Sequence, residues 1–220
     1  MSTRYTLIIG TKDWSSWSLR GYMAMRATGA PFEEVFVRLR QEMLTGDEIR
    51  KHSKAGRVPI LTIEENGQSV TVWDSLAICE TLAECHPQAK LWPSDAMVRA
   101  EARSYAAEMH SDFADLRDQL AMDFARRLPL PTLRDDTMAQ IARSIDAWSS
   151  ALGRFGKDGG FLFGNFSVAD CMYAPVVSRF RTYGVAVPER IAIYMERMLA
   201  LPAMVDWDAA AQKEVAAGLA

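Results

Sequence analysis

The first 85 residues alternate compact apolar runs with segments in which apolar residues recur at helical spacing. A continuous apolar run of this kind predicts a strand, whereas the segment from 16 to 28 has the periodicity of an amphipathic helix that Gly29 ends. In chain order, the expected elements are a strand at 5–9, a helix at 16–28, a strand at 32–39, a short helix at 46–53, a hairpin over 58–75 and a helix at 76–85.

The hairpin is predicted from a turn dipeptide between two β-like runs. Asn66 and Gly67 both tolerate the left-handed backbone conformation that a tight hairpin turn needs. Asp74 and Ser75 follow the second run and are candidate N-caps of the next helix. The resulting order, βαβαββα, predicts that residues 1–85 form an α/β domain of the thioredoxin-like kind.

The chain beyond residue 85 has a different pattern. Residues 86–95 contain two prolines and few apolar positions, so we interpret them as a linker. From 96 to 220 the long runs have helical periodicity, which predicts an all-helical bundle and an α/β plus all-α fold class. The expected helical runs are 96–127, 134–153, 168–184, 188–200 and 203–217, with breaks at 128–132, 156–166, Gly184 and Pro202.

Of the 220 residues, 49% are hydrophobic and 24% are charged. This balance is typical of a globular protein and argues against a disordered chain or a disulfide scaffold. The net charge of −3 offers no general attraction to nucleic acid or to an anionic membrane, and no apolar run is long enough to span a bilayer. Three cysteines without a CxxC pair predict buried, reduced side chains in a cytoplasmic protein without a signal peptide.

The segment DWSSWSLR (13–20) places hydroxyl groups where the first strand gives way to the first helix. A helix N-terminus has unpaired N–H groups and the positive end of the helix dipole, so it stabilises a bound anion. Ser15 or Ser16 also suits a simple N-cap. Both roles fit, because adjacent serines can divide them.

Two further segments begin a strand and a helix. A cis bond at Val58-Pro59 would leave the N–H and C=O of Val58 free to pair with an extended peptide, and an ordinary trans bond is the alternative. Asp74 and Ser75 suit a ligand that carries both an ammonium and a carboxylate. For this pair, simple capping is the alternative.

Taken together and in this order, these residues resemble the cytosolic glutathione transferase family. The run SSWSLR is most similar to the zeta-class pattern SSC-x-W-R and to serine-type bacterial enzymes. The resemblance implies that Ser15 contacts the sulfur of glutathione. It also implies that Val58 pairs with the cysteinyl backbone beside a cis-proline at Pro59, and that Asp74 and Ser75 hold the γ-glutamyl end.

The resemblance extends to the helical half of the chain. Ser167 and Asp170 form a variant of the capping box that resembles the family's motif at a buried helix, so we expect them to have a structural role. Trp17 stands where the zeta pattern has a cysteine, which lowers the expectation of zeta-type isomerase chemistry.

Two parts of the expected site have several candidates. Those for the glycine end of glutathione are Gln41, Lys54 and Arg57. Trp14 and Trp17 are expected to line the pocket of the second substrate, an electrophile. Further candidates for this pocket are Met109 and Phe113, for which ordinary core packing is the alternative.

The resemblance therefore predicts a glutathione transferase that joins the thiolate of glutathione, stabilised by Ser15, to small hydrophobic electrophiles. A non-catalytic binding or regulatory module of the same fold is one alternative, and a glutathione-dependent isomerase or peroxidase is another. A homodimer is implied by the family. No metal site is expected, because the three histidines lack ligand-like spacing.

Overall fold

Four strands form one mixed sheet in the first half of the chain. The computed structural model describes residues 3–156 and 160–220. The strands lie in the order β2-β1-β3-β4, with β1 and β2 parallel and the other neighbouring pairs antiparallel. Their bounds are β1 Arg4–Gly10, β2 Phe32–Val37, β3 Ile60–Glu65 and β4 Gln68–Trp73.

Helices cover both faces of this sheet. They are α1 Ser16–Thr28, α2 Glu42–Arg50 and α3 Ser75–Cys85. Along β1, Leu7 and Ile9 are buried in the core that contains α1 and α3, whereas Ile8 packs in a second core with Ile49 of α2. Successive side chains of a strand point to opposite faces, so the continuous apolar run of β1 packs against helices on both sides.

The predicted order βαβαββα is confirmed. Gly29 ends α1 with a φ angle of 71°, and Asn66 and Gly67 have φ angles of 51° and 78° in the hairpin turn. The second helix differs in extent, because it begins at Glu42 rather than at 46. Its first turn is supported by the N–H of Gln41, which donates to Thr45 Oγ1 at 2.9 Å.

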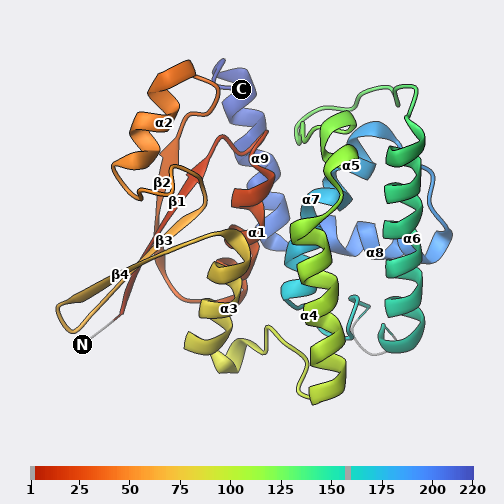
Figure 1. The fold of residues 1–220 in the computed structure, drawn as a ribbon, viewed down its shortest axis with the longest axis horizontal. Coiled ribbons are helices and arrows are strands. Elements are labelled where there is room, and N and C mark those ends of the chain that lie inside the picture. Colours follow the sequence, from red (N-terminus) through yellow and green to blue (C-terminus); the bar gives the residue numbers. More distant parts are fainter. Residues whose placement is uncertain (1–2, 157–159) are drawn as a thin grey trace.

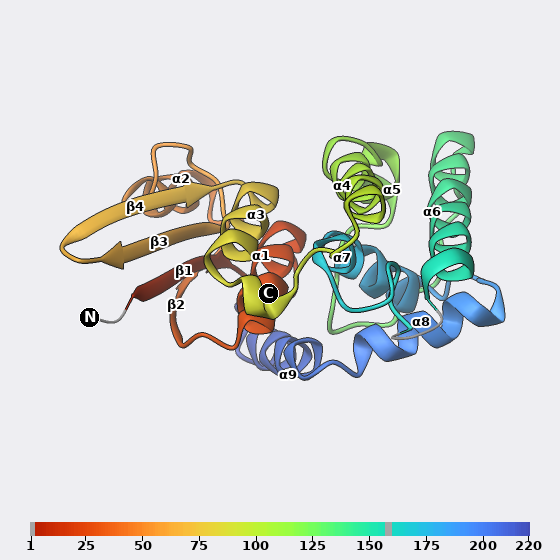
Figure 2. The same cartoon turned by 90° about the horizontal axis from the view of Figure 1, so that it is seen from below.

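The second half is helical and follows a segment that contains a short 3₁₀ helix, Pro87–Ala89. Figures 1 and 2 show α4 to α8 gathered beside the first half, whereas α9 returns to lie beside α1. The bounds are α4 Ala96–Ser111, α5 Ala114–Gln119, α6 Asp135–Phe155, α7 Val168–Tyr183, α8 Glu189–Leu199 and α9 Pro202–Ala216.

The single long helical run expected over 96–127 is wrong. The chain breaks at Phe113, which has a φ angle of 64°, and the segment between α5 and α6 is not helical. Asp112 Oδ1 accepts the N–H of Phe113 at 2.7 Å, a local hydrogen bond of the kind that competes with the helix. The ring of Phe113 is buried, so tertiary packing favours this turn.

The other expected breaks have mixed outcomes. Gly184 ends α7 with a φ angle of 62°, and Pro202 begins α9. The break at 156–166 includes 157–159, which lie outside the described residues. Within the described remainder, two isolated β-bridges join residues of 161–165, and the helical periodicity of this half did not predict them.

Almost all residues of α7 are buried, and this helix packs against both α1 and α4 (Figure 2). The N–H and the hydroxyl of Ser167 donate to Asp170 Oδ2 at 2.9 and 3.0 Å. The expected capping box is therefore present. Burial raises the pKa of Asp170 to about 6, even though four hydrogen bonds to its carboxylate act in the opposite direction.

Cys79 and Cys171 are buried, whereas Cys85 is exposed at the end of α3. The expectation that all three cysteines are buried is therefore wrong for Cys85. In the part of the chain that the structure describes, no helix combines the length and the apolar character that crossing a membrane requires.

Candidate active site

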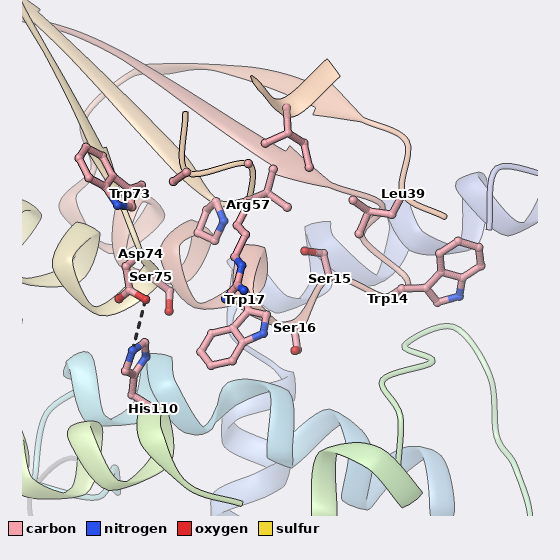
Figure 3. Close-up of a pocket in the computed structure, with 15 residues that line it drawn as sticks. Trp14, Ser15, Ser16, Trp17, Leu39, Arg57, Trp73, Asp74, Ser75 and His110 are labelled. Atoms are coloured by element: carbon pink, nitrogen blue, oxygen red, sulfur yellow. Dashed lines mark ion pairs between the residues drawn. The ribbon is translucent and has the colours of Figure 1, made fainter. Parts of the chain in front are cut away.

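A cleft of about 900 Å³ lies where α1 and α3 begin. Among the described residues that line it, only His110 of α4 comes from the helical half, and it faces the α3 start across the cleft (Figure 3). The structure therefore brings three separately predicted segments to one cavity. The predicted residues that line it are Trp14, Ser15, Trp17, Arg57, Val58, Pro59, Asp74 and Ser75.

Ser15 is the N-cap residue of α1, which confirms the capping role that the sequence suggested. Its Oγ accepts a hydrogen bond from the N–H of Ser18 at 3.4 Å and lies 2.7 Å from Ser18 Oγ. The side chain is largely buried but still lines the cleft, and Figure 3 shows its hydroxyl pointing toward the cavity. An anion bound here would lie beside the unpaired N–H groups of a helix N-terminus.

Remote parts of the chain hold the loop between β1 and α1. Glu214 Oε2 of α9 accepts the N–H groups of Lys12 at 2.6 Å and of Asp13 at 3.3 Å. Trp207 Nε1, also on α9, donates to the carbonyl of Lys12 at 2.9 Å. The last helix of the chain therefore fixes the loop that leads into Ser15. The sequence carried no local signal for these contacts, because the partners lie at opposite ends of the chain.

The Val58–Pro59 peptide bond is cis, as the resemblance implied. It lies directly before β3, and both residues line the cleft. No hydrogen bond from the described residues engages the N–H or the C=O of Val58. The main chain here can therefore pair with an extended ligand in the manner of an added strand.

Asp74 and Ser75 form the third wall of the cleft. Asp74 has a φ angle of 77° and caps α3 through Oδ1, which accepts the N–H of Leu76 at 2.9 Å. Its Oδ2 lies 3.2 Å from His110 Nε2. Ser75 is buried, and its Oγ has no hydrogen-bond partner among the described residues. A buried hydroxyl without a partner beside an accessible carboxylate suits a ligand with both donor and acceptor groups.

Trp17 forms the floor of the cleft toward the helical half (Figure 3). Its ring lies edge-on to His110, with 5.4 Å between the centroids. On the same ring lie two guanidinium groups, that of Arg20 at 4.1 Å and that of Arg117 at 5.5 Å from the centroid. Trp17 therefore separates the cleft from a group of cations.

This group consists of Arg20, Arg117 and Arg179, none of which forms an ion pair with a described residue. Burial, reinforced by Arg179 and Arg117, lowers the pKa of Arg20 to about 9. Burial and then Arg117 lower the pKa of Arg179 to about 10. Positive charge that has no ion-pair partner among the described residues lies beside the cleft and favours negative charge within it.

Four predicted site residues do not line this cleft: Met109, Phe113, Gln41 and Lys54. Met109 and Phe113 are buried in the core, where Phe113 packs against Tyr173. Gln41 lies in a neighbouring hollow that shares Trp14 with the cleft. Helical periodicity identified an apolar stripe on α4, but it did not identify the residue of α4 that faces the cavity. That residue is His110.

No cluster of three or more metal-binding side chains was found among the residues that the structure describes. A comparison with curated proteins found no match. The family model of the glutathione S-transferase N-terminal domain matches residues 14–85, and that of the C-terminal domain matches residues 131–212.

The chain is also similar to solved structures over most of its length. An omega 2S glutathione transferase from Trametes versicolor, in complex with 2,4-dihydroxybenzophenone, is 22% identical with a TM-score of 0.71, and 99% of each chain is covered. A Burkholderia glutathione transferase homologue with bound glutathione is 24% identical with a TM-score of 0.71, covering 96% of this chain and 99% of that one.

A maleylacetoacetate isomerase from Anaeromyxobacter dehalogenans with glutathione in its active site is 23% identical, with a TM-score of 0.68. The match covers 94% of this chain and 95% of that one. At these identities the structural likeness shows the fold. The two family models together span more than half of the sequence, and the chain therefore belongs to the glutathione S-transferase family.

Proposed function

We propose that this protein conjugates the thiolate of glutathione to small hydrophobic electrophiles. The observation that carries the proposal is the convergence of Ser15, the cis Val58–Pro59 peptide and the Asp74–Ser75 pair on one cleft. Each segment offers a different chemistry, and the three match the three parts of the tripeptide that the family resemblance assigns to them.

Glutathione would lie across the cleft in an extended conformation. The γ-glutamyl ammonium would meet Asp74 and its carboxylate would meet Ser75 Oγ, which lacks a partner among the described residues. The cysteinyl backbone would pair with the free main-chain groups of Val58. For the glycine end, Arg57 lines this cleft, whereas Gln41 belongs to the neighbouring hollow, so we favour Arg57.

The sulfur would then face Ser15. A thiol with a pKa of about 8.5 is only about 3% ionised at pH 7, and lowering that pKa by about 2 units makes roughly three quarters of it thiolate. This shift requires about 2.7 kcal/mol, within reach of one charge-assisted hydrogen bond helped by a helix N-terminus. The N-cap position of Ser15 supports that role.

Ionisation alone accounts for little acceleration. A less basic thiolate is also a weaker nucleophile, so a roughly 25-fold gain in thiolate leaves a net gain of about 3-fold. Orientation of the electrophile against the sulfur must supply more. Trp14 and Trp17 line the cleft on either side of Ser15 and provide the apolar surface for this task.

The remaining features of the proposal come from the family resemblance. Residues 1–85 would form the glutathione-binding domain, 86–95 the linker and 96–220 the helical domain that completes the electrophile site. The enzyme would act as a cytoplasmic homodimer in detoxification, with glutathione as co-substrate and no metal.

Two measurements test the proposal. Retention on immobilised glutathione and turnover of a chromogenic aryl halide are both expected, and retention without turnover would instead indicate a non-catalytic binding module. Product analysis with maleyl compounds and hydroperoxides distinguishes conjugation from isomerase or peroxidase chemistry. Ser15→Ala should raise the pKa of bound glutathione toward that of a free thiol, and an unchanged pKa would refute the role of Ser15.

A further inference from the structure

We infer that Ser18 is a positioning residue that directs the hydroxyl hydrogen of Ser15 toward the sulfur. The inference rests on the proposed function, in which Ser15 donates a hydrogen bond to a thiolate. Ser18 itself is fully buried and does not line the cleft, so it acts through Ser15 and not on the ligand.

The hydrogen bonds of Ser18 set a direction. Its Oγ accepts the N–H of Gly10, at the end of β1, at 3.0 Å, and lies 2.7 Å from Ser15 Oγ. A hydroxyl has one hydrogen and two lone pairs, whereas a backbone N–H can only donate. Gly10 therefore occupies a lone pair and leaves the hydrogen of Ser18 free. Ser15 Oγ is the acceptor that the described residues place within its reach.

The single hydrogen between the two oxygens can come from either serine. When Ser15 donates it, the hydrogen of Ser15 is used within the protein and cannot reach a sulfur. When Ser18 donates it, Ser15 keeps its own hydrogen for the ligand. A negatively charged sulfur beside Ser15 selects the second arrangement, because a thiolate can only accept.

The selected arrangement is a chain of donors from Gly10 through Ser18 and Ser15 to the sulfur. Each hydrogen bond in such a chain polarises and strengthens the next one. The N–H of Ser18 adds a weaker contact to Ser15 Oγ at 3.4 Å. The hydroxyl of Ser15 is thereby tied both to the first turn of α1 and to the end of the central strand.

The test is a pH titration of the thiolate absorbance of bound glutathione in the full-length protein at saturating ligand. We expect Ser15→Ala to give the largest increase in thiol pKa. Ser18→Ala should raise it by roughly 0.5 to 1 unit, equivalent to three- to tenfold less thiolate below the pKa. Ser18→Thr keeps the hydroxyl and should restore the value. Ser144→Ala, a buried serine on α6 outside the cleft, is the matched control.

Binding of S-methylglutathione separates positioning from structural damage, because this thioether cannot ionise. We expect Ser18→Ala to leave its affinity unchanged. If Ser18→Ala weakens the binding of S-methylglutathione as much as that of glutathione, and Ser18→Thr does not restore either affinity, Ser18 has a structural role. That result would overturn the inference. If Ser18→Ala does not fold, Ser18→Cys, with its weaker S–H donor, should still raise the thiol pKa, and a wild-type value would overturn the inference.

The two ideas fail differently. A thiol pKa that is unchanged in Ser15→Ala refutes the role of Ser15 in the proposed function, and the role of Ser18 with it. A pKa that rises in Ser15→Ala but stays at the wild-type value in Ser18→Ala leaves the proposed function intact and refutes the role of Ser18.

Discussion

His110 Nε2 lies 3.2 Å from Asp74 Oδ2, so a side chain of the helical half contacts the residue that begins α3 across the cleft (Figure 3). The other oxygen of Asp74 caps the helix through Leu76. Under the proposed function, the γ-glutamyl ammonium needs the oxygen that His110 occupies. Ligand and imidazole therefore compete for one carboxylate.

We predict that His110→Ala lowers the KM for glutathione. Both side chains of the pair are partly exposed, and such pairs contribute about 0–1 kcal/mol, so a two- to fivefold decrease is expected. Steady-state kinetics with varied glutathione measure it, with His52→Ala as the control because His52 does not line the cleft. An increase in KM would show instead that His110 contacts the ligand favourably.

We expect the ring of Trp17 to contact the electrophile more than it contacts glutathione. Its ring packs on Arg20 and His110 and exposes apolar surface to the cleft. Trp17→Ala should therefore lower kcat/KM for an aryl electrophile by about five- to thirtyfold, the equivalent of about 1–2 kcal/mol of aromatic contact, with little change in the KM for glutathione. Trp17→Phe should recover much of the loss.

The control for this prediction is Trp92→Ala, since Trp92 lies outside the cleft. An equal loss for small aliphatic and for aryl electrophiles would contradict the assignment of Trp17 to the aromatic substrate. That pattern would indicate that the tryptophan supports the loop around Ser15 instead.

The features that sequence alone predicted are those determined by nearby residues. The hairpin turn at Asn66-Gly67 and the capping box of Ser167 and Asp170 are fixed by backbone preferences within a few residues. Gly29 ends α1 for the same reason. Such local signals predict the order of the helices and strands, and the fold was predicted from that order.

The features that sequence missed depend on contacts between distant residues. The helix breaks at Phe113 where the ring of that residue packs in the core against distant parts of the chain. The apolar periodicity of α4 does not show that His110 faces the cleft. Glu214 lies about 200 positions from Lys12, whose N–H it accepts. No pattern within a short window contains that information.

Asp170 should couple stability to pH. Burial raises its pKa from 3.8 to about 6, so the folded carboxyl holds its proton more tightly than the unfolded one. Its contribution to stability is therefore fully present below about pH 3.8 and is lost as the pH rises through about 6. Relative to a non-titrating Asp170→Asn variant, the unfolding free energy of the wild type should rise by about 2 kcal/mol between pH 7 and pH 4.

Urea unfolding of both proteins across this range measures the difference in unfolding free energy. Asp135→Asn, at an exposed aspartate of α6, serves as the control and should show no comparable trend. A wild-type minus variant difference that does not change with pH would contradict the raised pKa of Asp170.

Glu214 should influence the reaction from outside the cleft. Glu214→Ala would leave the N–H groups of Lys12 and Asp13 without their acceptor, at a cost of about 1–3 kcal/mol in unfolding free energy. Because these residues lead directly into Ser15, the loop should lose its fixed position. We therefore predict a larger decrease in kcat than in affinity for glutathione, since orientation of the reacting sulfur is more sensitive to small displacements than binding is.

Glu214→Gln makes this prediction specific, because its amide oxygen has two lone pairs and can still accept both N–H groups that Oε2 accepts, while the negative charge is lost. Its kcat should lie between those of wild type and Glu214→Ala. Glu196→Ala, at an exposed glutamate of α8, controls for the loss of a surface carboxylate. If Glu214→Ala is destabilised but keeps the wild-type kcat at a temperature where it is folded, then α9 stabilises the fold without positioning Ser15, and the contacts at Lys12 have no part in the reaction.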